Sequence, residues 1–152
     1  MSMCFLAGQH DAPEAIRERL CTELERLVQL HGVTEMIVGH RGNFDRMATA
    51  AVQAVLRKRP ELYGRALVAY RNSPDNVPLP AFFEAHYYPI ELNNVPLRCA
   101  IVRANQIALV QCDFFLTYCN REGGNAGKLL QQAKRMAKKG DIQVINLAQD
   151  DL

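Results

Sequence analysis

The sequence has little that would point to a membrane protein, a disulfide scaffold or a serine hydrolase. No apolar run reaches the ~18 residues that a membrane-spanning helix needs. The five cysteines are odd in number and include no CxxC pair, which argues against a zinc knuckle and a disulfide framework. The only serines are Ser2 and Ser73, and neither position suggests a catalytic triad. We expect a cytoplasmic protein with reduced thiols, and we assign it no metal ion and no cofactor.

An excess of charge of one sign is also missing, because the formal net charge is only +2. A nucleic-acid surface needs a basic patch, often interleaved with aromatic side chains, and the sequence contains no such patch. The basic residues Lys134, Arg135, Lys138 and Lys139 are interpreted as a solvated helix face near a helix C-terminus. We therefore expect neither nucleic acid nor a membrane as a partner.

The length of 152 residues is that of one domain, and we expect residues 1–152 to form one. Apolar runs alternate with segments of helical periodicity. Strands are predicted near residues 3–8, 35–39, 66–70, 113–118 and 142–147. Between them, Leu20, Leu24 and Leu27 recur at helical spacing, and further helices are predicted up to Pro60 and over residues 101–110 and 128–138. This alternation predicts an α/β fold, a Rossmann-like three-layer sandwich around a mostly parallel five-stranded sheet.

Five of the seven prolines fall within residues 72–96. Proline lacks a backbone donor and restricts the chain, so we predict a long and mostly irregular excursion here, with one short helix near residues 81–86.

A glycine-rich turn at residues 122–128 (EGGNAGK) separates a predicted strand from a predicted helix. Such a turn leaves backbone N–H groups free at the positive end of the helix, where phosphate binds. The spacing matches neither a Walker P-loop nor GxGxxG. Two interpretations stay open: a tight turn that needs glycine for positive φ, and an anion cradle, which we favour.

A second glycine turn, residues 39–45 (GHRGNFD), occupies the same strand-to-helix position. Gly42 would let the backbone approach a ligand, Arg41 could pair with a phosphate, and Asn43 or Asp45 could bond ribose hydroxyls or cap the helix. Because parallel strands end at one edge of a sheet, the turns should converge there. The expected ligand-binding residues are Gly8, Gln9, His10, Gly39, Arg41, Gly42, Asn43, Asp45, Arg71, Arg103, Asn120, Gly123, Gly124, Asn125 and Gly127.

Residues 38–48 (VGHRGNFDRMA), read together with Arg103–Ala104–Asn105, the GGNAGK turn and residues 145–147 (INL), resemble small bacterial proteins of the SLOG superfamily. This group includes the lonely-guy phosphoribohydrolases and the DNA-processing protein A family, and the likeness is greatest to small single-domain members. The resemblance implies a Rossmann-like domain that binds a nucleotide or a phosphate-bearing derivative. It leaves a homo-oligomer open, because apolar helix faces in this superfamily commonly pair.

In the lonely-guy enzymes the second turn reads PGGxGTxxE, and its glutamate works with an arginine to cleave an N-glycosidic bond. Gly123 and Gly124 match the paired glycines and Arg103 could match the arginine, whereas Leu130 stands at the glutamate position. A leucine cannot act as an acid or a base. The leading hypothesis is therefore a regulatory or sensing nucleotide-binding domain. The alternatives are a nucleoside 5′-monophosphate phosphoribohydrolase or related N-glycosidase, and a DNA-associated module.

Overall fold

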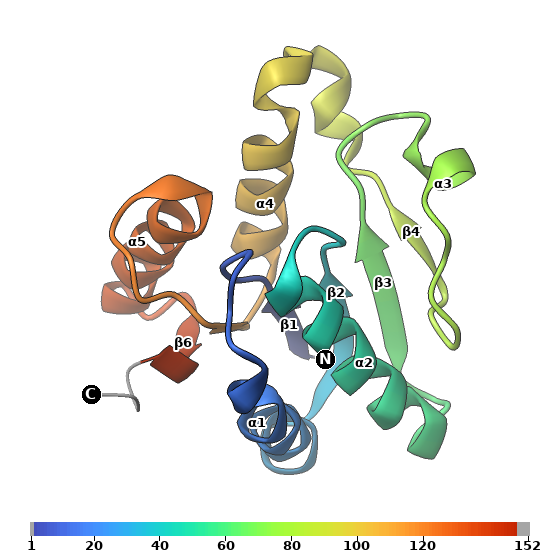
Figure 1. Cartoon of the computed structure of the whole chain (residues 1–152), viewed down its shortest axis with the longest axis vertical. Coiled ribbons are helices and arrows are strands. Elements are labelled where there is room, and N and C mark those ends of the chain that lie inside the picture. Colours follow the sequence, from blue (N-terminus) through green and yellow to red (C-terminus); the bar gives the residue numbers. More distant parts are fainter. Residues whose placement is uncertain (1, 149–152) are drawn as a thin grey trace.

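A computed structural model describes residues 2–148 as a parallel sheet of six strands with helices on both faces (Figure 1). The strands are β1 (Ser2–Leu6), β2 (Val33–Val38), β3 (Tyr63–Leu67), β4 (Ala85–Tyr87), β5 (Phe114–Thr117) and β6 (Gln143–Asn146). Their order in the sheet is β4-β3-β2-β1-β5-β6, and every neighbouring pair is parallel. The expected α/β class and parallel sheet are confirmed, in a Rossmann-like arrangement.

Four α-helices of twelve residues or more form the outer layers: α1 (Arg17–His31), α2 (Asn43–Lys58), α4 (Ala100–Gln111) and α5 (Gly124–Lys138). The short helices are α3 (Ser73–Asn76) and the 3₁₀ turns η1 (Glu14–Ile16), η2 (Ile90–Asn94) and η3 (Leu97–Cys99). One core cluster joins the sheet to α1 and α2, and a second joins its other face to α4 and α5. Within residues 2–148, no helix is both long and apolar enough to cross a membrane.

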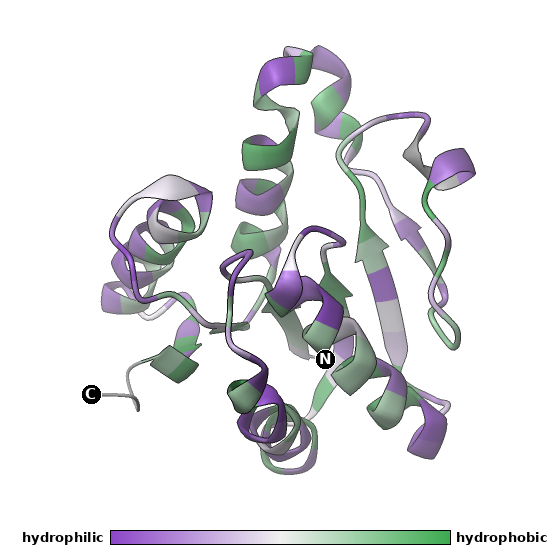
Figure 2. Ribbon diagram, viewed as in Figure 1, coloured by the Kyte–Doolittle hydropathy of each residue, from purple (hydrophilic) through white to green (hydrophobic). Residues whose placement is uncertain are grey.

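The two cores follow from the period-2 alternation of strand side chains. In β5, Phe114 belongs to the cluster under α1 and α2, whereas Phe115 belongs to the cluster under α4 and α5. Each helix supplies one apolar face, such as Leu20, Leu24 and Leu27 of α1, and Figure 2 shows hydrophobic and hydrophilic residues alternating along the helices. Strands buried on both faces are what a parallel sheet requires.

The expectation of five strands is wrong, because β4 adds a sixth at the edge beside β3. It lies in the proline-rich excursion, and its residues Ala85–Tyr87 replace part of the short helix expected near residues 81–86. The strand has three residues and pairs only with β3, so it carries no apolar run or alternation that the sequence could reveal. β3 also begins earlier than expected, at Tyr63, and ends at Leu67.

Helix α5 begins at Gly124, four residues before the expected start. In the first turn of this helix, a Cβ atom at Gly127 would stand 2.5 Å from the carbonyl oxygen of Glu122. The helix and the loop before it therefore touch backbone to backbone, which only glycine permits. The three glycines of the turn are thus Gly123 at the N-cap and Gly124 and Gly127 in the first helical turn.

The strand order reverses between β1 and β5, since the chain proceeds toward β4 on one side of this pair and toward β6 on the other. In open α/β sheets, ligands bind outside the carboxyl ends of the strands at such a point. The loops that follow β1 and β5 meet at this place.

Candidate functional site

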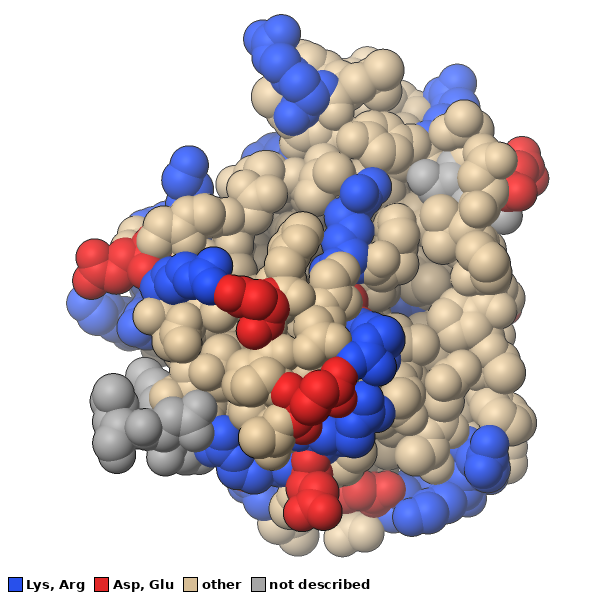
Figure 3. All heavy atoms as spheres, in the orientation of Figure 1, with Lys and Arg blue, Asp and Glu red and all other residues tan. Residues whose placement is uncertain are grey.

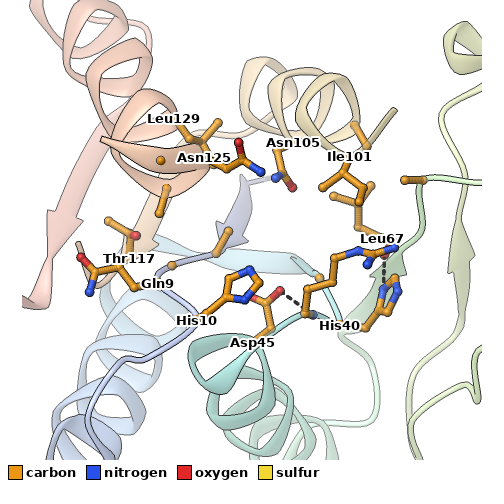
Figure 4. A pocket seen from close by; sticks show the side chains of 18 of the residues that line it. Gln9, His10, His40, Asp45, Leu67, Ile101, Asn105, Thr117, Asn125 and Leu129 are labelled. Atoms are coloured by element: carbon orange, nitrogen blue, oxygen red, sulfur yellow. Dashed lines mark hydrogen bonds between the residues drawn. The ribbon is translucent and has the colours of Figure 1, made fainter. Parts of the chain in front are cut away.

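A cavity of about 230 Å³ lies at the carboxyl edge of the sheet, between the loops after β1, β2 and β5 and the helices α4 and α5 (Figure 4). Its lining comprises Ala7, Gly8, Gln9, His10, Gly39, His40, Arg41, Asp45, Leu67, Ala69, Ile101, Ala104, Asn105, Phe115, Thr117, Arg121, Gly123, Gly124, Asn125, Ala126 and Leu129. The volume falls below the ~300–1,000 Å³ of pockets for drug-sized ligands. This cavity is therefore small for a dinucleotide.

Gln9, in the loop after β1, forms hydrogen bonds to the loop after β5. Its Oε1 accepts the backbone N–H of Asn120 at 2.6 Å, and its backbone N–H donates to the carbonyl of Tyr118 at 3.1 Å. Its side-chain amide also donates to Asp11. Gln9 is only 5% exposed, so these bonds are made in a setting where their loss would be costly. The loops after β1 and β5 are thus held in one arrangement before any ligand arrives.

The N-terminus of α2 is occupied by the protein itself. The N–H groups of Asn43 and Phe44 donate to the carbonyls of His10 and Gln9, at 2.7 and 3.4 Å. Gly42 permits this contact, because its φ is +92° and a Cβ atom there would lie 2.7 Å from Cα of His10. The second glycine turn therefore fastens the β1 loop to α2 and leaves fewer donors for a ligand.

The N-terminus of α5 is open. The N-cap Gly123 makes no side-chain capping bond, and Gly123, Gly124 and Asn125 line the cavity. A Cβ atom at Gly123 or Gly124 would meet nothing within 4 Å. The first N–H groups of a helix lack helical partners and carry its positive partial charge. Of the two helix starts at this edge, α5 is therefore the one that can receive an anion.

Asp45 is the one carboxylate in the cavity lining, and it is 7% exposed. One oxygen accepts the backbone N–H of Arg41 at 3.0 Å, and within residues 2–148 the other oxygen is buried without a partner. Burial raises the pKa of Asp45 to about 7, against the lowering effect of the Arg41 N–H and guanidinium. Gly39 makes room for this carboxylate, since a Cβ there would lie 2.5 Å from Oδ2. The cavity therefore holds a carboxyl group that changes charge near neutral pH.

The basic groups of the lining differ in how free they are. Arg121 forms an ion pair with Asp11, and the guanidinium of Arg41 lies 5.9 Å from the ring centre of Tyr70. Burial lowers the pKa of His40, whose Nδ1 lies 3.2 Å from the carbonyl of Leu67. A carbonyl can only accept, so Nδ1 carries the proton and Nε2 is left as an acceptor. Among these three, Arg41 is the cation that no carboxylate neutralises through a described ion pair.

Nine of the fifteen residues expected at the site line the cavity: Gly8, Gln9, His10, Gly39, Arg41, Asp45, Gly123, Gly124 and Asn125. The structure does not bring Gly42, Asn43, Arg71, Arg103, Asn120 and Gly127 into that lining. Gly42, Asn43 and Gly127 make the backbone contacts described above, and the N–H of Asn120 is taken by Gln9. Arg71 lies exposed beyond β3.

Arg103 and Leu130, which the resemblance aligns with the arginine and the glutamate of the lonely-guy enzymes, both lie outside the cavity lining. Arg103 is exposed on α4 and hydrogen-bonds Gln106 at 3.2 Å, because it stands two residues from Ile101 and so on the opposite helix face. Leu130 is buried in the core between α5 and the sheet. The glutamate and arginine of the lonely-guy enzymes therefore have no counterpart in the lining at these positions.

The sequence-based list missed polar side chains of the lining, chiefly Asn105 of α4, Thr117 at the end of β5 and Arg121 in the loop after β5. Asn105 could have been found, because it follows Ile101 by four residues on a helix face otherwise occupied by Ala104 and Ala108. A polar side chain within such a buried stripe points to a lined cavity.

Charged side chains of both signs are interleaved on the face that Figure 3 shows, and large parts of this face carry no charge. This pattern agrees with the small net charge of the sequence and gives no support for nucleic-acid binding on that face. Within residues 2–148, no group of three or more His, Cys, Asp or Glu side chains could hold a metal ion.

No model of a known protein family matches the chain, and no curated protein is significantly similar to it. Membership of the SLOG superfamily therefore stays a prediction from the residues quoted above.

Proposed function

We propose that this protein binds a nucleotide or a nucleotide derivative, with the phosphate seated at the N-terminus of α5, and that it serves as a regulatory or sensing domain. The observation that carries the proposal is the uncapped start of α5, where Gly123 and Gly124 present open backbone to the cavity. Backbone N–H groups and the helix dipole at such a place favour phosphate. The guanidinium of Arg41 supplies a further positive charge in the lining.

The cavity also has the composition of a small-molecule site. Apolar side chains from both sides of the sheet edge face it, namely Ala7, Leu67, Ala69, Ile101, Phe115 and Leu129. Beside them stand a few polar groups at fixed positions, a combination that is typical of pockets that orient an organic ligand. These apolar side chains would make no favourable contact with a purely inorganic anion.

The substitution Gly123→Ala tests the cradle with little disturbance of the fold. The φ of Gly123 is −95°, and a Cβ atom there would occupy open space. We therefore expect the substitution to cost less than about 1 kcal/mol of stability. The methyl group would stand where a phosphate approaches the backbone, and the affinity for adenosine 5′-monophosphate should fall at least about tenfold. Isothermal titration calorimetry measures this, with melting curves as the folding control. Equal affinity of wild type and variant would mean that the turn connects β5 to α5 but does not bind the phosphate.

The N-glycosidase alternative is favoured by one observation, the buried Asp45 carboxyl in the cavity lining with its pKa near 7. A group poised at this pH can act as a general acid or base. We nevertheless expect release of free base from nucleoside 5′-monophosphates to be weak or absent, because no carboxylate replaces the glutamate at Leu130. Chromatography of the reaction mixture measures base release. Robust release by wild type that Asp45→Asn abolishes would establish the hydrolase instead.

A further inference from the structure

Two side-chain amides converge at the cavity from different helices. Asn105 comes from α4 and Asn125 from the first turn of α5, and Figure 4 shows their ends turned toward each other, across the cavity from His10 and Asp45. Within residues 2–148, neither amide hydrogen-bonds to another side chain or to the backbone. Their donors and acceptors are therefore free for a ligand.

Each amide stands one helical turn from an aliphatic side chain that lines the same cavity. Ile101 precedes Asn105 by four residues, and Leu129 follows Asn125 by four, so each pair shares one helix face. Leu129 is buried and Ile101 half-buried. The result is a space between α4 and α5 with apolar walls and a polar edge, which matches a flat heteroaromatic ring with hydrogen-bonding atoms on one side.

An amide differs from the other polar groups of the cavity in offering a donor and an acceptor together. A phosphate only accepts, and the proposed function assigns it to the backbone N–H groups of α5 and to Arg41. The edge of a nucleobase presents donors and acceptors side by side, and asparagine is among the side chains that read such edges through two hydrogen bonds. The chemistry of the amides thus points to a base rather than to a second anion.

We propose that Asn105 and Asn125 read the hydrogen-bonding edge of a nucleobase, so that the ligand of this cavity is a nucleotide rather than a bare sugar phosphate. This inference rests on the proposed function, because it takes the phosphate at α5 as given. Asn105 is the better probe of the two, because it belongs to α4 and not to the first turn of α5.

The experiment compares adenosine 5′-monophosphate, inosine 5′-monophosphate and ribose 5-phosphate by calorimetry on wild type and Asn105→Ala. We expect at least one nucleotide to bind wild type about tenfold more tightly than ribose 5-phosphate, and Asn105→Ala to remove most of that difference while leaving the affinity for ribose 5-phosphate unchanged. The matched control is Gln106→Ala, one residue further along α4 and outside the cavity lining, which should change neither affinity.

A second variant, Asn105→Asp, changes the chemistry of the edge while nearly keeping its shape. A carboxylate only accepts, so the preference should shift toward adenosine 5′-monophosphate, whose base carries an amino donor where inosine 5′-monophosphate carries an oxygen. Equal binding of ribose 5-phosphate and both nucleotides, or an equal loss for all three in Asn105→Ala, would overturn the inference and leave phosphate binding intact. If none of the three compounds binds, the proposed function fails and this inference with it.

Discussion

Replacement of Asp45 by asparagine should flatten the pH dependence of the protein's stability between pH 4 and pH 8. The pKa of Asp45 is raised from 3.8 to about 7 by burial, so the folded state holds this proton more tightly than the unfolded state does. Its contribution to stability is therefore fully present below pH 4 and is lost as the pH rises through about 7. The lost contribution amounts to at most about 4 kcal/mol.

The measurement is the free energy of unfolding from urea titrations of wild type and Asp45→Asn at several pH values. In Asp45→Asn, a buried amide group without a hydrogen-bond partner adds a cost of roughly 1–3 kcal/mol that does not depend on pH. The test is therefore how the difference in unfolding free energy between wild type and Asp45→Asn changes with pH. Asp75→Asn, which alters an exposed aspartate in α3, should run parallel to wild type. If the stability of Asp45→Asn also changed with pH in parallel with wild type, the Asp45 carboxyl would not be the titrating group.

Two identical substitutions four residues apart, Gly127→Ala and Gly123→Ala, should differ clearly in their effect on the protein's stability. Gly127→Ala drives a methyl group into the carbonyl of Glu122, 2.5 Å away, and so forces the loop off the start of α5. The strain outweighs the roughly 1 kcal/mol that alanine gains over glycine inside a helix, and we expect a net loss of about 1–3 kcal/mol. For a chain of this length, the melting temperature should fall by roughly 3 to 10 °C.

Gly123→Ala serves as the partner in this comparison, because its methyl group meets no atom within 4 Å. Thermal melts followed by circular dichroism should separate the two variants clearly. If Gly127→Ala melted with wild type, the backbone contact between the loop and the helix would not matter for stability. The two glycines would then have to be distinguished by ligand binding alone.

The sequence could predict the parallel α/β core because its strands and helices carry strong local signals. Buried strands such as Phe114–Thr117 are short apolar runs, and α1 is followed by the C-cap Gly32, whose φ of +68° favours glycine. β4 could not be predicted, because an edge strand of three residues is defined by its partner β3 and not by its own pattern. The start of α5 was missed because glycine is a poor helix former. The close contact between Gly127 and the backbone of Glu122 explains why a glycine stands inside this helix.

The candidate site divides in the same way. Residues at strand ends, such as Gln9 and Gly39, could be placed at one edge by topology alone. Gly42 and Gly127 were expected near a ligand, yet they serve contacts between backbones, which no single sequence can separate from ligand approach. Arg103 was expected at the site because of the resemblance alone, and it lies on the exposed face of α4. Asn105 was missed although it interrupts an apolar face of α4, because the sequence does not show that this face lines a cavity beside α5.

The parallel pairing of Cys4 in β1 with Phe114 in β5 also sets when the cavity can exist during synthesis. The two strands are joined only after about 110 further residues have been made, which takes a ribosome roughly 5 to 20 seconds. Until then, the loop that holds Gln9 has no Tyr118 or Asn120 to bond, and the start of α5 has not emerged. In a nascent chain, the cavity therefore cannot form before β5 has joined β1 and the start of α5 has followed it.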